Sequence, residues 1–535
     1  MMKYLIQNGT VYDGTGKAPK QADVLVSGDR IVSVEPGLNV PDAKAVDARG
    51  KAVAPGFIDI HRHCDFRPMA DPDFGKVELA QGITTTIAGN CGLAPVPAPA
   101  RFRQEMYDFI EPCLGVPAPG TDFADYHAYS CAVGSSALNM NMGFLAGTGA
   151  VKTAVKGYGK EPYTPEEMQR AVGYVEEAMN VGAFGVSMGI MYQPECYSSV
   201  EELVSLVRPA AKHGGVLCCH IRGEGDSLVE SVREIISIAG RAGIRLNISH
   251  FKSTGIKNWN KKIYEAIGAV EQARSKGQDV MVDFYPYTGG STTLLTLLPP
   301  CVLEKTQALT LQKLSTEAGK KELREQIYRT HPGWDNMVTG IGWKNILISS
   351  LENPEHAAFQ GKNVEELAAQ NGYADPSDFA CDLLVSEKGK VGIIVLSMDQ
   401  NDVDTVARLP YSMVISDSLY GGGGSPHPRL YGSFAKIVRE YVLERRVLTL
   451  EQAVRKMTSM PAERMRLDGR GTIAPGNYAD INIFDPREFR DNAVYSDPKQ
   501  LSTGMQWVFL NGVPVWHDGS LEARGNGRFL KRNSL

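Results

Sequence analysis

Two histidines stand one residue apart at the end of an apolar run, in the segment GFIDIHRH that spans residues 56–63. Along a β-strand, residues i and i+2 point to the same side, so His61 and His63 are expected to emerge as a pair. Two neutral imidazoles at a strand end can supply half of a zinc site. The alternative is an ordinary pair of surface or core histidines, and ligands at other strand ends decide between the two.

Further residues of the metal-ligand type lie at the ends of other apolar, strand-like runs. They are Cys91, His220, His250 and Asp417. Imidazole, thiolate and carboxylate all bind zinc, and a mixed set with an open position is typical of a catalytic rather than a structural site. The shared strand-end placement favours this interpretation over a set of unrelated core or loop residues.

The chain between these residues alternates strand-like and helix-like patterns. Capping-box sequences predict helix starts at Thr164, Ser199 and Ser227. Repeated strand–helix units imply a parallel sheet with helices outside, and eight units close into a barrel whose active site lies at the carboxyl ends of the strands. The alternation lapses between about 296 and 345, which predicts an insertion at the top face of the barrel. Late barrel strands are expected at residues 346–349, 393–396 and 413–417.

Both ends of the chain consist of short β-rich runs separated by turn sequences. Hairpin turns are expected at Asn8-Gly9, at residues 27–30 and at Asn511-Gly512. We expect all these strands to form one small β-sandwich or β-barrel domain. The predicted fold class is therefore α/β, a metal-dependent (β/α)8 TIM-like barrel plus a small β-domain. The expected domains are residues 1–55 and 476–535 for the β-domain, and 56–475 for the barrel with its insertion.

The composition is that of an ordinary globular protein, with 535 residues, 43% hydrophobic and 22% charged residues, and a formal net charge of −5. No run of lysine and arginine indicates a nucleic-acid surface, and no apolar stretch is long enough to span a bilayer. The nine cysteines are scattered without a C-x-x-C spacing, so neither a disulfide framework nor a zinc ribbon fits. The first residues lack a secretory signal pattern, and cytoplasmic residence is the default expectation.

An ordered set of motifs resembles a known family over nearly the whole chain. It resembles the N-acyl-D-amino-acid deacylases (D-aminoacylases) of the amidohydrolase superfamily. The motifs are residues 55–63 (PGFIDIHRH), 89–92 (GNCG), 219–225 (CHIRGEG), 248–252 (ISHFK), 283–287 (DFYPY) and 426–429 (PHPR).

The resemblance implies zinc-dependent hydrolysis of the amide of an N-acyl-D-amino acid by attack of metal-bound water. Cys91, His220 and His250 would then hold one zinc ion tightly. A second, weaker position that shares Cys91 would be framed by His61, His63 and Asp417. The bridging carboxylated lysine of hydantoinase-type relatives is not evident, and Cys91 takes its place. Asp417 can accept the water's proton and deliver it to the leaving amine.

The substrate is expected to be a small molecule with an α-carboxylate, which requires fixed cations and hydrogen-bond donors. Residues at the positions where the family binds this carboxylate are Lys252, Tyr285, Ser291 and Arg429, with Arg222 as a nearby alternative and Tyr192 as a further substrate contact. The stretch 292–298 is apolar and lacks arginine and lysine, which argues against a dedicated D-glutamate or D-aspartate enzyme. Neutral, hydrophobic D-substrates are therefore expected.

The chain departs from the family pattern at Thr148, where relatives often have histidine, and at Ser418, where they have glycine. These changes spare the expected zinc ligands and leave open a different acyl group or a cyclic amide. The nearest alternative function is a cyclic-amide hydrolase of the hydantoinase, dihydroorotase or imidase type. A catalytically silent amidohydrolase-like scaffold is the alternative from another class. The oligomeric state is left open, and no nucleic-acid or membrane partner is expected.

Overall fold

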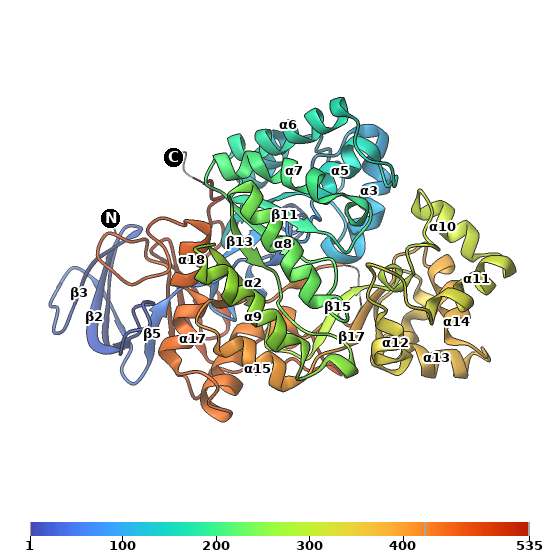
Figure 1. Ribbon diagram of the computed structural model, residues 1–535. Coiled ribbons are helices and arrows are strands. Elements are labelled where there is room, and N and C mark those ends of the chain that lie inside the picture. The colour runs from blue at the N-terminus through green and yellow to red at the C-terminus, as the bar shows by residue number, and fades with distance from the viewer. Residues whose placement is uncertain (1, 422–423, 533–535) are drawn as a thin grey trace.

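Parallel strands surrounded by helices form the centre of the computed structural model, which describes residues 2–421 and 424–532 (Figure 1). Pairing between neighbours is parallel from β6 through β8 and β9, and from β10 through β11, β12, β13 and β14 to β18. The parallel pair β7–β19 joins the first strand position to the last and closes the barrel. The strands are β6 (Phe57–Asp59), β7 (Arg62–His63), β8 (Ile83–Ala88), β9 (Asn141–Phe144), β10 (Ala146–Gly147), β11 (Gly185–Gly189), β12 (Val216–His220), β13 (Arg245–Ile248), β14 (Val280–Phe284), β18 (Ser412–Val414) and β19 (Ser418–Leu419). The predicted TIM-like barrel is confirmed.

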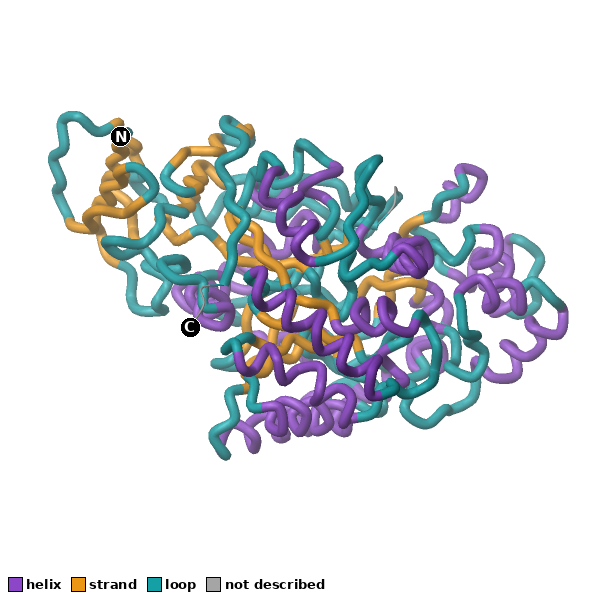
Figure 2. The backbone as a smooth tube through the Cα atoms, turned by 90° about the horizontal axis from the view of Figure 1, so that it is seen from above, coloured by secondary structure: helices purple, strands orange, loops and turns teal. Residues whose placement is uncertain are grey.

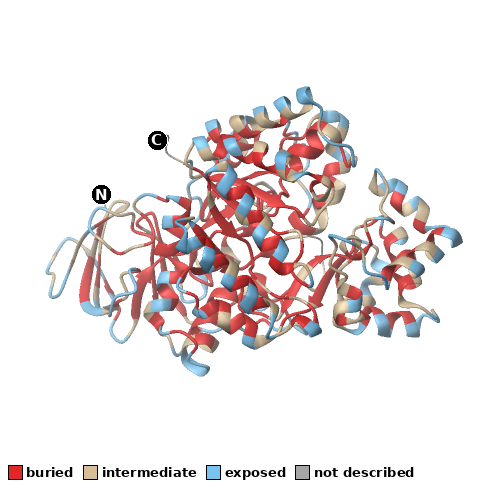
Figure 3. Cartoon of the chain, in the orientation of Figure 1, coloured by how far each residue is buried: buried red, intermediate tan, exposed pale blue. Residues whose placement is uncertain are grey.

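Amphipathic helices cover the outside of the barrel, and Figure 2 shows the strands enclosed by them. The main ones are α6 (Pro165–Val181), α7 (Val200–Lys212), α8 (Leu228–Ala242), α9 (Lys262–Ser275), α15 (Gln400–Arg408) and α17 (Leu450–Met457). Figure 3 shows buried strands inside and helices with one buried and one exposed face. The barrel strands are buried on both sides, as expected for a parallel sheet covered by helices.

Two of the three predicted helix starts have the expected capping hydrogen bonds. Thr164 and Ser199 each accept a bond from the amide three residues on, and the glutamate there bonds back to the cap. The helix start predicted at Ser227 is also confirmed, because α8 begins at Leu228 with Ser227 as its N-cap, but the Ser227 side chain makes no cap bond. Its hydroxyl instead donates to Asp335, 2.9 Å away in a distant part of the chain. A tertiary partner has replaced the local one.

An inserted lobe interrupts the barrel between β14 and β18. Its antiparallel sheet contains β15 (Gly289–Thr293), β16 (Ile346–Ser350) and β17 (Gly392–Leu396), with helices α10 (Gln307–Leu314), α11 (Glu317–Ile327), α12 (Met337–Ile341), α13 (Val364–Gln370) and α14 (Pro376–Ser386). The prediction that 346–349 and 393–396 are barrel strands is wrong, and the expected limits 296–345 are too narrow. The lobe has a hydrophobic core of its own, so β16 and β17 are as apolar as barrel strands. Figure 1 shows it in yellow beside the barrel.

Both chain ends contribute to a single nine-stranded sheet, in which β20 pairs antiparallel with β5. Its strands are β1 (Lys3–Val11), β2 (Lys20–Ser27), β3 (Arg30–Glu35), β4 (Lys44–Asp47), β5 (Ala52–Pro55), β20 (Ile481–Phe484), β21 (Met505–Leu510), β22 (Val513–His517) and β23 (Ser520–Leu521). The expected turn at Asn8-Gly9 is wrong. Asn8 has a positive φ of 63° inside β1, at a register shift opposite β2. Domain boundaries at 55 and 475 stay a prediction.

No helix within the described residues is both long enough and apolar enough to cross a membrane.

Candidate metal centre

The ligand-type residues lie at the carboxyl ends of the barrel strands, around one end of the barrel. His61 lies between β6 and β7, His63 ends β7 and His220 ends β12. Three others follow their strands in a left-handed backbone conformation, which is uncommon for residues other than glycine: Cys91 (φ 54°), His250 (φ 37°) and Asp417 (φ 51°). Such outliers persist only where the surrounding structure holds them, and they cluster at functional sites.

The donor atoms of these side chains form three overlapping groups, each within 4.8 Å. The groups are His61–His63–Cys91, Cys91–His220–His250 and His61–His250–Asp417. Cys91 joins the first two, because its Sγ lies 3.3 Å from His61 Nε2 and 3.6 Å from His250 Nε2. All six residues are buried. The structure therefore brings together every ligand that the strand ends suggested.

The chemistry of this donor set fits zinc. Burial lowers the pKa values of His220 and His250 well below the usual range, so both imidazoles are neutral, as metal ligands must be. Burial also raises the pKa of the Cys91 thiol well above its usual range. A thiolate there would need a cation in direct contact, and zinc supplies that charge when it binds. Thiolate with imidazole is a soft, mixed donor set typical of zinc.

His250 is oriented from behind by a carboxylate that the sequence patterns did not single out. Glu224 Oε1 lies 2.9 Å from His250 Nδ1, so it can accept the Nδ1 proton and leave Nε2 free to face Cys91. Such carboxylate–histidine pairs are a regular feature of zinc sites. Glu224 also pairs with Lys252, whose Nζ is 2.5 Å from the same oxygen and 2.8 Å from His250 Nδ1. Lys252 thus lines the pocket with its charge already compensated.

Asp417 is held between imidazoles and a guanidinium. Its Oδ1 lies 3.3 Å from His61 Nε2 and 3.4 Å from His63 Nε2, and its Oδ2 lies 2.9 Å from Arg429 Nη1. Burial alone would raise the pKa of Asp417, but Arg429 and His61 hold it well below its usual range. Asp417 is therefore ionised, and it can accept a proton only when its contacts with Arg429 and the imidazoles change.

Arg429 is a buried cation that has hydrogen-bond donors without partners. The residue is 1% exposed, and its Nε and Nη2 find no hydrogen-bond partner within the described residues. Its guanidinium lies 4.8 Å above the ring of Tyr285. The backbone of Arg429 is fixed by His427, whose Nδ1 accepts its amide proton at 3.0 Å. Buried donors without partners indicate an anionic ligand in the pocket.

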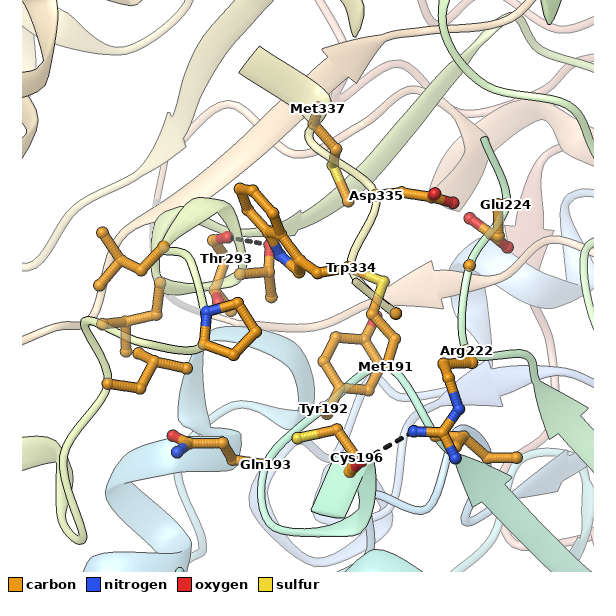
Figure 4. Close-up of a pocket in the computed structure, with 18 of the residues that line it drawn as sticks. Met191, Tyr192, Gln193, Cys196, Arg222, Glu224, Thr293, Trp334, Asp335 and Met337 are labelled. Atoms are coloured by element: carbon orange, nitrogen blue, oxygen red, sulfur yellow. Dashed lines mark hydrogen bonds between the residues drawn. The ribbon is translucent and has the colours of Figure 1, made fainter. Parts of the chain in front are cut away.

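The remaining expected substrate contacts are placed differently. Ser291 lines the metal pocket, and its hydroxyl donates to the carbonyl of Ile393 at 3.1 Å. The Tyr192 hydroxyl lies 3.4 Å from His220 Nδ1. Arg222 faces a neighbouring chamber instead, where its Nη2 donates to Glu234 at 3.0 Å and its Nη1 donates to the Cys196 carbonyl at 2.8 Å (Figure 4).

Neither departure from the family pattern adds or removes a metal donor. Thr148 is buried, and its hydroxyl lies within hydrogen-bonding distance of the carboxylate of Glu195 and of the carbonyl of Ser187. Ser418 is buried in β19 beside Arg62 of β7. Met191 was missed by the sequence patterns, although its Sδ lies 3.2 Å from His220 Nε2. Nothing in the sequence near Met191 indicates this contact, which depends on how the loop after β11 folds.

Comparisons with known proteins agree with this geometry. A model of the amidohydrolase family matches residues 44–108 and 352–519. The chain is 30% identical over 533 residues to the D-aminoacylase of Alcaligenes xylosoxydans xylosoxydans, covering 99% of this chain and 98% of that protein. It is 31% identical to the N-acyl-D-glutamate deacylase of the same organism, covering 99% and 96%. The crystal structure of N-acyl-D-glutamate deacylase from Bordetella bronchiseptica, complexed with zinc and a phosphonate inhibitor, is 30% identical, with 99% of each chain covered and a TM-score of 0.83.

Proposed function

Since this chain belongs to the N-acyl-D-amino-acid deacylase family of amidohydrolases, we propose that it hydrolyses N-acyl-D-amino acids with neutral, apolar side chains. It is a hydrolase of carbon–nitrogen bonds in linear amides. One observation carries the finer proposal: the buried Arg429, with unpartnered donors, lies next to Asp417 at the edge of a complete zinc donor set. An anion-binding group, a proton acceptor and a metal site therefore share one pocket.

Cys91, His220 and His250 hold the tightly bound zinc in this proposal. His61, His63 and Asp417 frame a second, weaker position that shares Cys91. When bound, zinc polarises the scissile carbonyl and lowers the pKa of a coordinated water toward about 7. The six donors are all present, which argues against a silent scaffold.

Asp417 acts as the general base and then as the general acid. It takes a proton from the attacking water and delivers it to the leaving amine nitrogen. Arg429 and Tyr285 bind the α-carboxylate of the substrate, with Ser291 beside them on the same wall. Binding of that carboxylate at Arg429 competes with the Asp417–Arg429 pair, so substrate itself would free Asp417 for proton transfer.

The proposed preference for substrates with neutral side chains follows from the lack of a further unpaired cation beside Arg429 among the described residues. A D-glutamate or D-aspartate side chain would need a second unpaired cation near the first. Lys252 is compensated by Glu224, and Arg222 is compensated by Glu234. The walls of the metal pocket otherwise include apolar side chains such as Leu93, Val395 and Leu419. A second carboxylate would therefore be buried without a counter-ion, which is costly.

A resolved substrate screen tests the proposal. Purified, zinc-loaded protein would be assayed with N-acetyl derivatives of D- and L-leucine, D-methionine, D-phenylalanine and D-glutamate. We expect D-leucine to exceed L-leucine in kcat/KM by at least about tenfold, and the neutral D-substrates to exceed D-glutamate. Preference for the L-enantiomer, or much faster turnover of N-acetyl-D-glutamate, would overturn the proposal. Asp417→Ala should lose turnover while keeping its tightly bound zinc.

A further inference from the structure

His427 is a buried histidine that takes no part in the proposed reaction steps. It lies in the segment PHPR, two residues before Arg429, where α16 (Arg429–Lys436) begins, and it is 4% exposed. Among the described residues, Arg429 lines the metal pocket and His427 does not. His427 therefore lies behind the residue that is proposed to bind the substrate carboxylate.

Both ring nitrogens of His427 have backbone partners. Nδ1 lies 3.0 Å from the backbone nitrogen of Arg429, and Nε2 lies 2.9 Å from the carbonyl oxygen of Gly289. An amide donates and a carbonyl accepts, so Nδ1 must be the acceptor and Nε2 must carry the proton. Only the neutral imidazole in this tautomer satisfies both bonds. Burial and the charge of Arg429 hold the pKa of His427 well below its usual range, which agrees with a neutral ring.

Two tyrosines pack against the imidazole of His427. The ring of Tyr287 lies at 90° to it, with the two ring centroids 5.1 Å apart. The ring of Tyr495 lies at 77° with a centroid distance of 5.0 Å, and its hydroxyl is 3.2 Å from Nε2. Such edge-to-face packing is a favourable arrangement of aromatic rings. An imidazole packed against two rings and bonded at both nitrogens has a fixed orientation.

The two backbone bonds of His427 connect segments that both line the metal pocket. Gly289 begins β15 in the inserted lobe. The next two residues, Gly290 and Ser291, line the pocket, as Arg429 does. Gly289 and His427 are 138 positions apart in the chain, so their hydrogen bond fixes how the two segments meet.

The guanidinium of Arg429 depends on its backbone for its position. It pairs with Asp417 at 2.9 Å, but its Nε and Nη2 have no hydrogen-bond partner within the described residues. A substrate carboxylate would compete for that ion pair, so the guanidinium must stay in place while its partner changes. The amide bond to His427 supplies an anchor that does not change with the substrate. A shift of about 1 Å in a substrate-positioning contact can cost about 100-fold in rate.

We propose that His427 is a positioning residue for recognition of the substrate carboxylate. Its Nδ1 holds the backbone of Arg429 so that the guanidinium meets the carboxylate, and its Nε2 proton ties this segment to β15. His427 contacts neither the substrate nor the metal ions in this proposal. The inference rests on the proposed function and adds a residue to its carboxylate-binding apparatus.

Conservative variants separate the roles of the two ring nitrogens. The side-chain oxygen of asparagine can accept the amide of the second residue along the chain, as in an Asx-turn, so His427→Asn can keep the bond to Arg429. His427→Gln keeps a donor that can reach Gly289 but places no acceptor at the position of Nδ1. His427→Leu removes both bonds.

The test compares kcat/KM for N-acetyl-D-leucine with kcat/KM for N-acetyl-D-leucinamide, which has no carboxylate. Loss of zinc or of folded protein lowers both values together, so the acid-to-amide ratio reports carboxylate recognition alone. This ratio should fall at least tenfold in His427→Leu and His427→Gln, and stay within about threefold of the wild-type ratio in His427→Asn.

An unchanged ratio in His427→Leu, or equal ratios in His427→Asn and His427→Gln, would overturn the inference while leaving the deacylase function intact. If His427→Leu does not fold, the comparison of the asparagine and glutamine variants decides by itself. A wild-type protein that hydrolyses neither compound would instead overturn the proposed function.

Discussion

The guanidinium of Arg429 lies 2.9 Å from the carboxylate of Asp417, and both side chains are buried beside the metal donors. The residue proposed to bind the substrate carboxylate is thus paired with the residue proposed to move the proton. Arg429 keeps Asp417 ionised while no substrate is bound. Substrate binding and release of the base are therefore coupled through one ion pair.

Arg429→Met is expected to lower kcat/KM for an N-acyl-D-amino acid by about 100-fold or more, because a buried charge pair with the substrate is lost. The matched probe is the corresponding N-acyl-D-amino acid amide, which has no carboxylate. Its kcat/KM should fall much less. Equal losses for the acid and the amide would remove Arg429 from carboxylate recognition and leave it only the role of holding Asp417.

Glu224→Ala should weaken zinc binding by about 10- to 100-fold, because His250 loses the acceptor of its Nδ1 proton. Glu224→Gln keeps an acceptor oxygen and should fall between the wild type and the alanine variant. Competition with a chromophoric chelator measures the affinity directly, without an activity assay. If all three proteins release zinc equally, Glu224 does not support zinc binding and only pairs with Lys252.

The two metal positions should respond differently to loss of a ligand. Cys91→Ala removes the donor common to two groups and should leave well under one zinc per chain after dialysis. His63→Ala touches only the second position and should retain one tightly bound zinc. Metal analysis of both variants after identical treatment provides the measurement. Full zinc retention in Cys91→Ala would place the tight site elsewhere.

Stability should depend on pH through an acidic cluster between α3 (Ala100–Leu114) and the inserted lobe. Lys390 lies 2.8 Å from Glu111 and 3.4 Å from Glu352. Burial and the neighbouring Glu352 raise the pKa of Glu111 from 4.5 to about 7. The folded protein therefore binds this proton more tightly than the unfolded chain does. The resulting stability is present at low pH and is lost as the pH rises through about 7.

Glu111→Gln should remove this contribution, so the Tm of the variant should fall less than that of the wild type between pH 5.5 and pH 8.5, by about 1 °C in a chain of this length. Asp108→Asn is the matched control, because Asp108 is 3.6 Å from the same lysine and more exposed. The Tm of this control should change with pH as the Tm of the wild type does. Parallel curves for the wild type and Glu111→Gln would show that Glu111 does not titrate in this range.

Much of the barrel could be predicted because its signals are local. Helix starts such as Thr164 and Ser199 satisfy their own amides within one turn, so a four-residue pattern is sufficient. The ligand-type residues were recognisable for a similar reason. A residue that follows an apolar strand reaches the carboxyl end of a parallel barrel wherever that strand lies in the order. The structure brings His61, Cys91 and His250 together at that end.

Only the tertiary structure decided which distant segments meet. β16 and β17 are as apolar as barrel strands, yet they pair with each other, and β17 pairs with β15, because the lobe buries them in a separate core. Ser227 has the residues of a capping box but bonds to Asp335, which lies 108 positions along the chain. Likewise, Glu224 and Met191 contact the metal ligands because of loop conformations that no local sequence pattern predicts. Residue types and strand ends were readable from the sequence, whereas contacts across loops depend on long-range packing.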